Sequence, residues 1–138
     1  MGRIRSQDDL IAKSRAMTSE SLSGKSILMV EDEYLIADTV RAALDMEGAS
    51  VVGPFSNVAD ALQALDQGIK PDAALLDVNL NGERVFPLVD RLMADHVPMA
   101  LTTGYDGSAI PHIYAHIHRL QKPVHLYELL DCINNLLR

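Results

Sequence analysis

Short apolar runs alternate along the chain with segments in which apolar residues recur every three or four positions. A helical stripe follows each of the first three runs, and another closes the chain, whereas each short run is typical of a buried strand. Strands that alternate with helices favour an α/β fold, in which right-handed crossovers build a doubly wound parallel sheet. The five predicted strands are Ile27–Val30, Val51–Val52, Ala73–Leu76, Met99–Thr102 and Ile117–Gln121.

Turn-forming residues indicate where these elements end. Gly48 and Gly68 are expected to stop the first two helices, and Ser56 to cap the second at its start. Gly53-Pro54 is expected to close the second strand, and Pro87 fits the first turn of the third helix. The segment before the fifth strand is irregular and contains glycine and proline, which predicts at most one or two turns of a degenerate fourth helix.

The first 24 residues differ from the rest of the 138-residue chain in being polar and rich in small residues. Leu10, Ile11 and Met17 could line one side of a short helix, although so few apolar residues do not fold alone. We therefore predict a flexible N-terminal tail over residues 1–24, with a docking helix as the alternative, and one domain over residues 25–138. Met17 is an alternative start of the protein.

Composition restricts the class of protein. A formal net charge of −7 without any basic run argues against a nucleic-acid surface, because duplex binding requires clustered Lys and Arg. No apolar stretch approaches the ~20 residues that span a bilayer. The single cysteine, Cys132, cannot form an internal disulfide, which fits the reducing cytoplasm, and we expect it to be a small packing residue.

The chemistry is predicted at the carboxyl ends of the strands, where ligands of open α/β sheets bind. Asp77 ends the continuous aliphatic run of the third strand. The same edge of the sheet is expected to receive Glu31, Asp32, Thr103 and Lys122, which follow the first, fourth and fifth strands.

Three carboxylates at one edge raise each other's pKa values unless a cation lies among them. Oxygen ligands of this kind suit Mg²⁺, which binds one or two carboxylates together with a phosphoryl oxygen. Asp77 would then be a nucleophile that forms an aspartyl phosphate. Lys122 would supply a fixed positive charge, and the Thr103 hydroxyl would donate to a phosphoryl oxygen.

Four motifs together resemble the response-regulator receiver domain of two-component signalling, over about residues 25–138. They are Val-Glu-Asp-Glu at 30–33, Leu-Leu-Asp-Val-Asn-Leu-Asn-Gly at 75–82, Thr-Thr-Gly-Tyr at 102–105 and Lys-Pro at 122–123. The resemblance implies a flavodoxin-like sheet with strand order 2-1-3-4-5. It also implies a single-domain regulator without an output domain, which signals by protein–protein contact or acts as a phosphate sink.

The resemblance assigns roles to individual residues. Asp77 would accept a phosphoryl group from a sensor histidine kinase, and Thr103 and Lys122 would contact the phosphoryl oxygens. Mg²⁺, or Mn²⁺, would be held by Asp32, by Glu31 directly or through water, by Asp77 and by the backbone carbonyl of Asn79. The bond between Lys122 and the following proline is commonly cis in receivers.

Two departures from the family pattern concern the conformational switch. Receivers usually carry an aromatic residue three positions before the lysine, where this chain has Arg119, so that Tyr105 is a substitute switch candidate beside Thr103. The motifs are similar to those of a stand-alone subgroup whose fourth strand ends in Phe-Ala-Thr-Gly-Tyr. That subgroup is typically paired with histidine kinases of the HWE type.

Simpler interpretations remain open for each residue. Asp77 and the Glu31-Asp32 pair could cap turns and helices, Lys122 could be a solvated surface lysine, and Thr103 could be an ordinary strand residue. Three histidines could hold zinc if their segment were helical, although no fourth ligand is obvious. They are His112, His116 and His118.

Two other classes of function compete with the receiver. One is a phosphatase or mutase of the haloacid-dehalogenase type, which requires an aspartate where the chain has Asn79. The other is a phosphate-independent interaction module with a vestigial site. The joint presence of Asp32, Asp77, Thr103 and Lys122 counts against that module.

Overall fold

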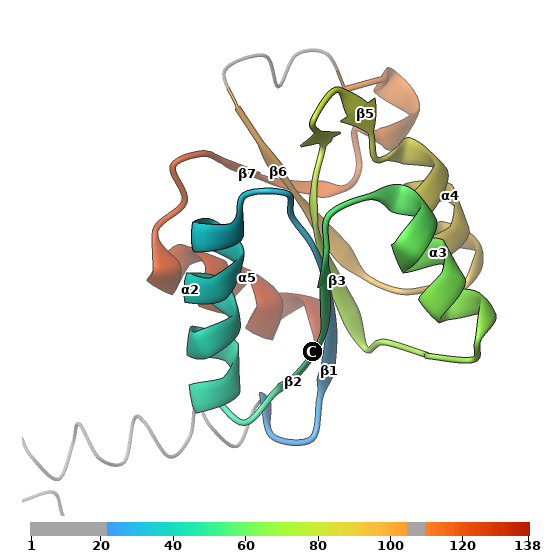
Figure 1. The fold of residues 1–138 in the computed structure, drawn as a ribbon. Coiled ribbons are helices and arrows are strands. Elements are labelled where there is room, and N and C mark those ends of the chain that lie inside the picture. Colours follow the sequence, from blue (N-terminus) through green and yellow to red (C-terminus); the bar gives the residue numbers. More distant parts are fainter. Residues whose placement is uncertain (1–21, 105–109) are drawn as a thin grey trace, which may run out of the picture.

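A parallel five-stranded sheet forms the centre of the molecule (Figure 1). The computed structural model describes residues 22–104 and 110–138. The sheet has the order β2-β1-β3-β6-β7, and all four neighbouring pairs are parallel. Counted over these five strands alone, this is the expected order 2-1-3-4-5, so the flavodoxin-like α/β prediction is confirmed. The strands are β1 (Ser26–Val30), β2 (Ser50–Phe55), β3 (Ala73–Asp77), β6 (Met99–Thr103) and β7 (His118–Gln121).

Helices cover both faces of the sheet in two pairs (Figure 1). Helices α2 (Tyr34–Met46) and α5 (Leu126–Leu136) pack on one face, and α3 (Val58–Asp66) and α4 (Phe86–Ala94) pack on the other. Successive side chains of a strand point to opposite faces, so β1 supplies Ile27 and Met29 to the α2–α5 core and Leu28 and Val30 to the α3–α4 core. Every residue of β3 is buried, as expected for a strand covered on both sides.

The second strand is longer than predicted. Gly53-Pro54 does not close it, because β2 continues to Phe55, whose carbonyl accepts a hydrogen bond from the Glu31 N–H at 2.9 Å. The pairing of β2 with β1 shifts register between Leu28 and Val30. A proline that lacks an N–H is tolerated here because β2 lies at the edge of the sheet.

The ends of the helices follow the predicted turn residues with one correction. The cap of α3 is Asn57 rather than Ser56, because the Asn57 side chain accepts the Asp60 N–H at 2.8 Å. Gly48 and Gly68 directly follow the C-terminal caps of α2 and α3 with positive φ, and Pro87 lies in the first turn of α4. The remaining start and stop predictions are therefore confirmed.

A two-stranded hairpin, not predicted from the sequence, follows Asp77 directly. Strand β4 (Asn79–Leu80) pairs with β5 (Glu83–Arg84) in antiparallel orientation. The two residues between them, Asn81 and Gly82, have φ values of 54° and 90°. Asn-Gly with two positive φ angles is the preferred sequence of a tight hairpin turn, so a local signal for this element was present.

The described part of the segment between β6 and β7 contains one short 3₁₀ helix, η2 (His112–Tyr114). Ile110, Tyr114 and Ile117 are buried in the α3–α4 core, where they take the place of a longer crossover helix. The predicted degenerate fourth helix is confirmed over residues 110–117, whereas Tyr105 and the Asp-Gly pair after it lie outside the described residues.

Leu22, within the segment predicted as a tail, contributes to the core of the domain. Leu22 is fully buried in the α2–α5 core, and the prediction for the preceding tail lies outside the described residues. Cys132 is buried in the same core, as predicted. No helix in the described ranges combines the length and apolarity required to cross a membrane.

Candidate functional site

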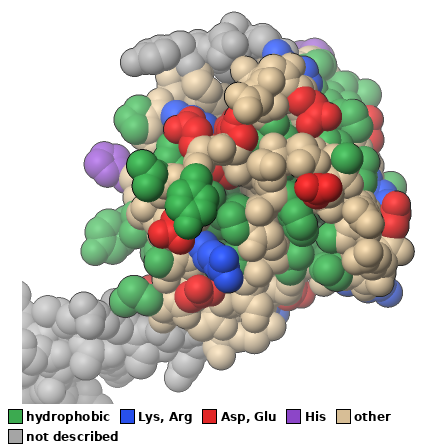
Figure 2. Space-filling model, in the orientation of Figure 1, with side chains coloured by type: hydrophobic (Ala, Val, Ile, Leu, Met, Phe, Trp, Pro, Cys, Tyr) green, Lys and Arg blue, Asp and Glu red, His purple; other side chains and the backbone are tan. Residues whose placement is uncertain are grey.

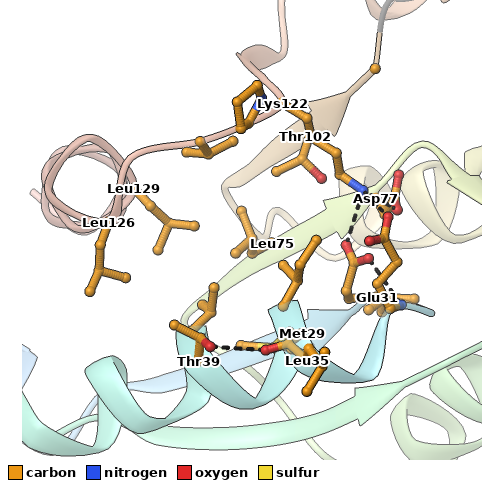
Figure 3. A pocket seen from close by; sticks show the side chains of 18 residues that line it. Met29, Glu31, Leu35, Thr39, Leu75, Asp77, Thr102, Lys122, Leu126 and Leu129 are labelled. Carbon is orange, nitrogen blue, oxygen red and sulfur yellow. Dashed lines mark hydrogen bonds and ion pairs between the residues drawn. The ribbon is translucent and has the colours of Figure 1, made fainter.

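Asp77 lies at the carboxyl end of the central strand, as predicted from the sequence. It is the last residue of β3, and only 5% of its surface is exposed. One carboxylate oxygen, Oδ2, lies 2.7 Å from Nζ of Lys122 (Figure 3). The other oxygen, Oδ1, accepts the Asn79 N–H at 3.1 Å. The Asp77 carboxyl group is thus held at the edge of the sheet by one ammonium group and one backbone amide.

Lys122 reaches Asp77 from the end of β7, which is separated from β3 by β6. Its backbone N–H donates to the Thr103 carbonyl at 2.7 Å, which fixes the chain immediately after the strand. Its Nζ also lies 3.5 Å from carboxylate oxygens of Glu31 and of Glu33. Burial disfavours the ammonium form, but the Asp77 hydrogen bond and the Glu31 charge outweigh it and raise the pKa of Lys122. The bond to the following proline is cis, as the family pattern implied.

Glu31 is a buried carboxyl group whose pKa is raised. It follows β1, is 9% exposed, and accepts the Glu33 N–H at 3.1 Å. Burial, followed by the nearby Asp77 carboxylate, raises the pKa of Glu31 from 4.5 to about 7, against the opposing effect of Lys122. One lysine therefore does not neutralise the carboxylates, and the site retains an affinity for a further cation.

The carboxylates of Glu31, Glu33 and Asp77 offer ligand oxygens that all lie within 4.8 Å of one another. Hard oxygen donors at this spacing fit a divalent ion such as Mg²⁺. The sequence predicted Glu31 and Asp77 in this role but missed Glu33, although Glu33 is the last residue of the Val-Glu-Asp-Glu motif. Asp32, predicted as the direct ligand, is half-buried and does not belong to this group of described carboxylates.

The two threonines at the end of β6 have different positions. Thr102 pairs with Asp77 in the sheet register and lines the pocket at the site together with Gly104. Thr103, the predicted hydroxyl donor, is buried at the end of the strand, and its carbonyl binds the Lys122 N–H. Neighbouring residues of a strand point to opposite faces, so Thr103 is directed away from the face on which Thr102 lines the pocket.

A pocket of about 580 Å³ extends from the acidic group into the groove between α2 and α5 (Figure 3). Its polar end contains Glu31, Glu33, Asp77 and Lys122. The rest of its wall is mostly aliphatic and includes Met29, Leu35, Leu75, Leu126 and Leu129.

The remaining predicted residues that the structure describes do not meet at the site. Arg119 is exposed on β7, beside Leu101 of β6 in the sheet register. Tyr105 lies outside the described residues. The histidines at 112, 116 and 118 are exposed, and among the described residues they contribute to no group of three close metal-ligating side chains. This arrangement gives the zinc alternative no support.

A family model named response regulator receiver domain matches residues 27–134. The chain belongs to this family. Receiver domains act in two-component signalling, where histidine kinases phosphorylate them, and they bind a divalent metal. The acidic group around Asp77 agrees with that chemistry.

Solved structures support the assignment. SdrG from Sphingomonas melonis Fr1 is 34% identical, with 86% of this chain and 98% of that chain covered at a TM-score of 0.72. The receiver domain of TorR, the response regulator of a TMAO respiratory system, is 29% identical, with 82% and 96% covered at a TM-score of 0.70. Full-length FixJ from B. japonicum shares the fold at 23% identity and a TM-score of 0.71, over 84% of this chain and 59% of that one. No curated protein matches the chain in a sequence search.

Proposed function

We propose that this receiver domain accepts a phosphoryl group on Asp77 from the phosphohistidine of a sensor histidine kinase. The observation that carries the proposal is the 2.7 Å contact between Asp77 Oδ2 and Lys122 Nζ, inside a group of carboxylates at the edge of the sheet. A buried carboxylate that contacts an ammonium group and lies beside further acids supports a role in phosphoryl transfer in addition to its contact with the turn amide of Asn79.

In the transfer, a carboxylate oxygen of Asp77 forms a bond to phosphorus while the phosphorus–nitrogen bond of the phosphohistidine breaks. The imidazole leaves with the electron pair of that bond and takes up a proton from solvent. The reaction requires mainly positioning and charge neutralisation. Lys122 supplies a positive charge that is already in place, and the Asn79 N–H fixes the orientation of the Asp77 carboxylate.

Glu31, Glu33 and Asp77 are the described residues whose geometry fits a divalent ion, and we propose Mg²⁺ there, with Mn²⁺ as a substitute. When bound, the ion would neutralise the carboxylates and orient the phosphoryl oxygens. From the resemblance to the receiver family, we also propose Asp32 and the backbone carbonyl of Asn79 as ligands of the ion. Thr103 remains the proposed hydroxyl donor, with Thr102 as the neighbour that already lines the pocket.

The surroundings of Asp77 suit contact with a kinase helix. Tyr34 and Leu35 at the start of α2 are 77% and 80% exposed, and Tyr127 at the start of α5 is 85% exposed. Figure 2 shows hydrophobic side chains next to acidic ones on the left of the view, the side on which α2 lies in Figure 1. Exposed apolar residues beside a charged centre indicate a binding surface. Because the Thr-Gly-Tyr motif is similar to that of the subgroup paired with HWE-type kinases, we propose that the partner kinase is of the HWE type.

The signalling output of the domain would depend on the phosphorylation of Asp77. Phosphorylated Asp77 would signal through contact with a partner protein or would drain phosphate from another regulator. We propose a cytoplasmic location for this function.

Incubation with acetyl phosphate and Mg²⁺, followed by intact mass spectrometry, tests the proposal. We expect the protein to gain the mass of one phosphoryl group, and the Asp77→Asn variant to gain none. Asp45→Asn, which changes an exposed aspartate on α2, is the matched control and should be labelled like the parent. Absence of the adduct from the parent would favour the phosphate-independent module instead.

The phosphatase alternative loses support at Asn79. The Asn79 Oδ1 accepts the Gly82 N–H at 2.8 Å, so this side chain is engaged in the hairpin and does not replace the acid of a haloacid-dehalogenase enzyme. We expect no turnover of small phosphate esters beyond hydrolysis of the aspartyl phosphate itself.

A further inference from the structure

The cavity at Asp77 continues beyond the acidic group as an aliphatic groove between α2 and α5, the α2–α5 groove (Figure 3). The volume of the whole cavity, about 580 Å³, lies within the range of about 300–1,000 Å³ that is common for small-molecule sites. Charged groups lie at one end, and the remaining wall is mostly aliphatic. Such a division is typical of a site whose ligand has one charged end and an apolar body.

The floor of the α2–α5 groove belongs to the buried sheet. Met29 of β1 and Leu75 of β3 are neighbours in the parallel register, and they are 1% and 6% exposed. Leu129 of α5 is a buried part of the wall, whereas Leu35 and Leu126 are 80% and 37% exposed. An aliphatic chain in the groove would therefore lie on an apolar floor and cover exposed leucine side chains, which is favourable.

The lining of the groove selects against polar ligands. Away from the acidic group, Thr39 supplies a polar side chain, and its hydroxyl already donates to the Leu35 carbonyl at 2.9 Å. The neighbouring lining residues on the two helices and before α5 are apolar, and they include Ile36, Ala37, Val40, Pro123 and Val124. A sugar or a nucleotide base would leave its donors and acceptors unpaired against such a wall, whereas a hydrocarbon chain has none to satisfy.

The groove and the Asp77 carboxylate belong to one cavity, so an apolar chain attached to a reacting phosphoryl group can lie in the groove. We propose that the α2–α5 groove selects a small-molecule phosphate donor. Asp77 accepts the phosphoryl group of acyl phosphates with a medium-length aliphatic chain, such as hexanoyl phosphate, in preference to acetyl phosphate. This inference rests on the proposed phosphorylation of Asp77 and adds a second class of donor to the kinase.

In this transfer, a carboxylate oxygen of Asp77 forms a bond to phosphorus while the bond between phosphorus and the acyl oxygen breaks. The acyl group leaves as a carboxylate with the electron pair of that bond, so the step requires no proton donor and no redox partner. The Lys122 ammonium, 2.7 Å from Asp77 Oδ2, supplies positive charge beside the transferred group. The acyl chain stays in the groove throughout the step, so its burial stabilises the bound donor and the transition state alike. A longer chain should therefore raise kcat/KM, mainly through a lower KM.

Phosphorylation of the whole chain by acetyl, butanoyl and hexanoyl phosphate, with Mg²⁺ and each donor below saturation, tests the inference. The three donors share the same reacting groups, and their spontaneous hydrolysis without protein corrects for differences in intrinsic reactivity. Intact mass spectrometry distinguishes a phosphoryl group on the protein from an acyl group transferred to lysine. We expect kcat/KM to rise about two- to fourfold for each added methylene, because a fully buried methylene corresponds to about fourfold. Asp77→Asn should gain no phosphoryl group from any of the three donors.

Three substitutions make the test specific. Thr39→Trp places a large ring in the groove from an exposed position, so the ratio of the hexanoyl to the acetyl rate should fall close to one. Leu126→Ser removes part of the wall without adding bulk and should lower the same ratio. Met46→Trp is the matched control, because Met46 is 83% exposed on α2 and does not line the pocket, and this variant should keep the ratio of the parent.

The outcomes separate this inference from the proposed function. Labelling by acetyl phosphate without any gain from the longer chains would overturn the inference and leave the proposed function intact. The same conclusion would follow if Thr39→Trp and Leu126→Ser both retained the gain of the parent. Absence of labelling by every donor would refute the proposed function, and this inference with it.

Discussion

Nζ of Lys122 lies 2.7 Å from Oδ2 of Asp77, although the two residues end strands that are not neighbours in the sheet. Strand β6 lies between β3 and β7, and the Thr103 carbonyl at its end binds the Lys122 N–H. The side chain of Lys122 therefore reaches across the end of one strand to the next. Parallel strands produce this convergence because their carboxyl ends share one edge.

Removal of the Lys122 ammonium group should make the folded protein less stable. We expect Lys122→Met to lower the free energy of unfolding at pH 8 by about 1–3 kcal/mol, because the buried carboxylates of Glu31 and Asp77 lose their nearest cation. The loss should shrink at pH 5.5, where Glu31, with its pKa of about 7, is protonated. Urea unfolding of the parent and the variant at both pH values measures this loss of stability. Lys70→Met changes an exposed lysine and should leave stability unchanged, and an equal loss at the two pH values would contradict the account.

Glu31 should make the metal-free protein less stable as the pH rises. Its pKa is raised by folding, so the folded state holds the proton more tightly and the stabilisation is complete only below pH 4.5. It declines through the interval up to about pH 7, and the change from 4.5 to about 7 corresponds to about 3 kcal/mol. Urea unfolding in EDTA across this range should show the decline.

Glu31→Gln provides the control for this pH dependence. The amide has a similar shape and carries no charge, so the variant should lose most of the decline and be more stable than the parent at pH 8. A variant whose stability follows that of the parent at every pH would show that another group causes the dependence.

Binding of Mg²⁺ should become tighter with rising pH between about 6 and 8, because the ion competes with the proton on Glu31. Calorimetry in buffers of different ionisation enthalpy detects the released proton.

The same titration compares Glu33→Gln with Asp32→Asn. The geometry predicts that Glu33→Gln weakens binding by about tenfold, within the range seen when groups around a metal are lost. Unchanged affinity in Glu33→Gln, with a loss in Asp32→Asn, would favour the ligand set implied by the motif.

The fold could be predicted in most respects because its signals are local. A continuous aliphatic run that ends at Asp77 indicates a buried parallel strand, and Gly68 stops the preceding helix where the backbone requires a positive φ. Asn57 replaced Ser56 as the cap of α3 because two neighbouring residues could both accept the amide. The choice between them depends on the backbone angle at which the chain enters the helix.

The site could be predicted only to the level of which strand ends meet. That Asp77 and Lys122 approach one another follows from the topology. Whether Asp32 or Glu33 turns toward them depends on the loop between β1 and α2, for which the sequence offers no periodic signal. The contact of Tyr114 with Phe86 joins residues 28 positions apart in the chain, and only the packing of η2 on α4 brings them together.

Gly53, the glycine of β2, should be difficult to replace. Its φ is +109°, and an added Cβ would lie 2.6 Å from the Met29 carbonyl oxygen. We expect Gly53→Ala to lower the free energy of unfolding by about 2–3 kcal/mol, since backbone strain and a backbone clash act together. Gly24→Ala is the matched control, because Gly24 also has a positive φ but nothing within 4 Å of an added Cβ. Thermal unfolding of both variants decides the point, and equal losses would show that the clash contributes nothing.

Reduction of the phosphorylated protein with borohydride, followed by peptide mass spectrometry, tests the central claim most directly. Borohydride reduces an acyl phosphate to an alcohol and so marks the residue that carried the phosphoryl group. After treatment with acetyl phosphate and Mg²⁺, we predict that the mark falls on Asp77 and that Asp77→Asn carries none. A mark on Glu31, on Glu33 or on no residue at all would contradict the assignment of Asp77 as the phosphate acceptor.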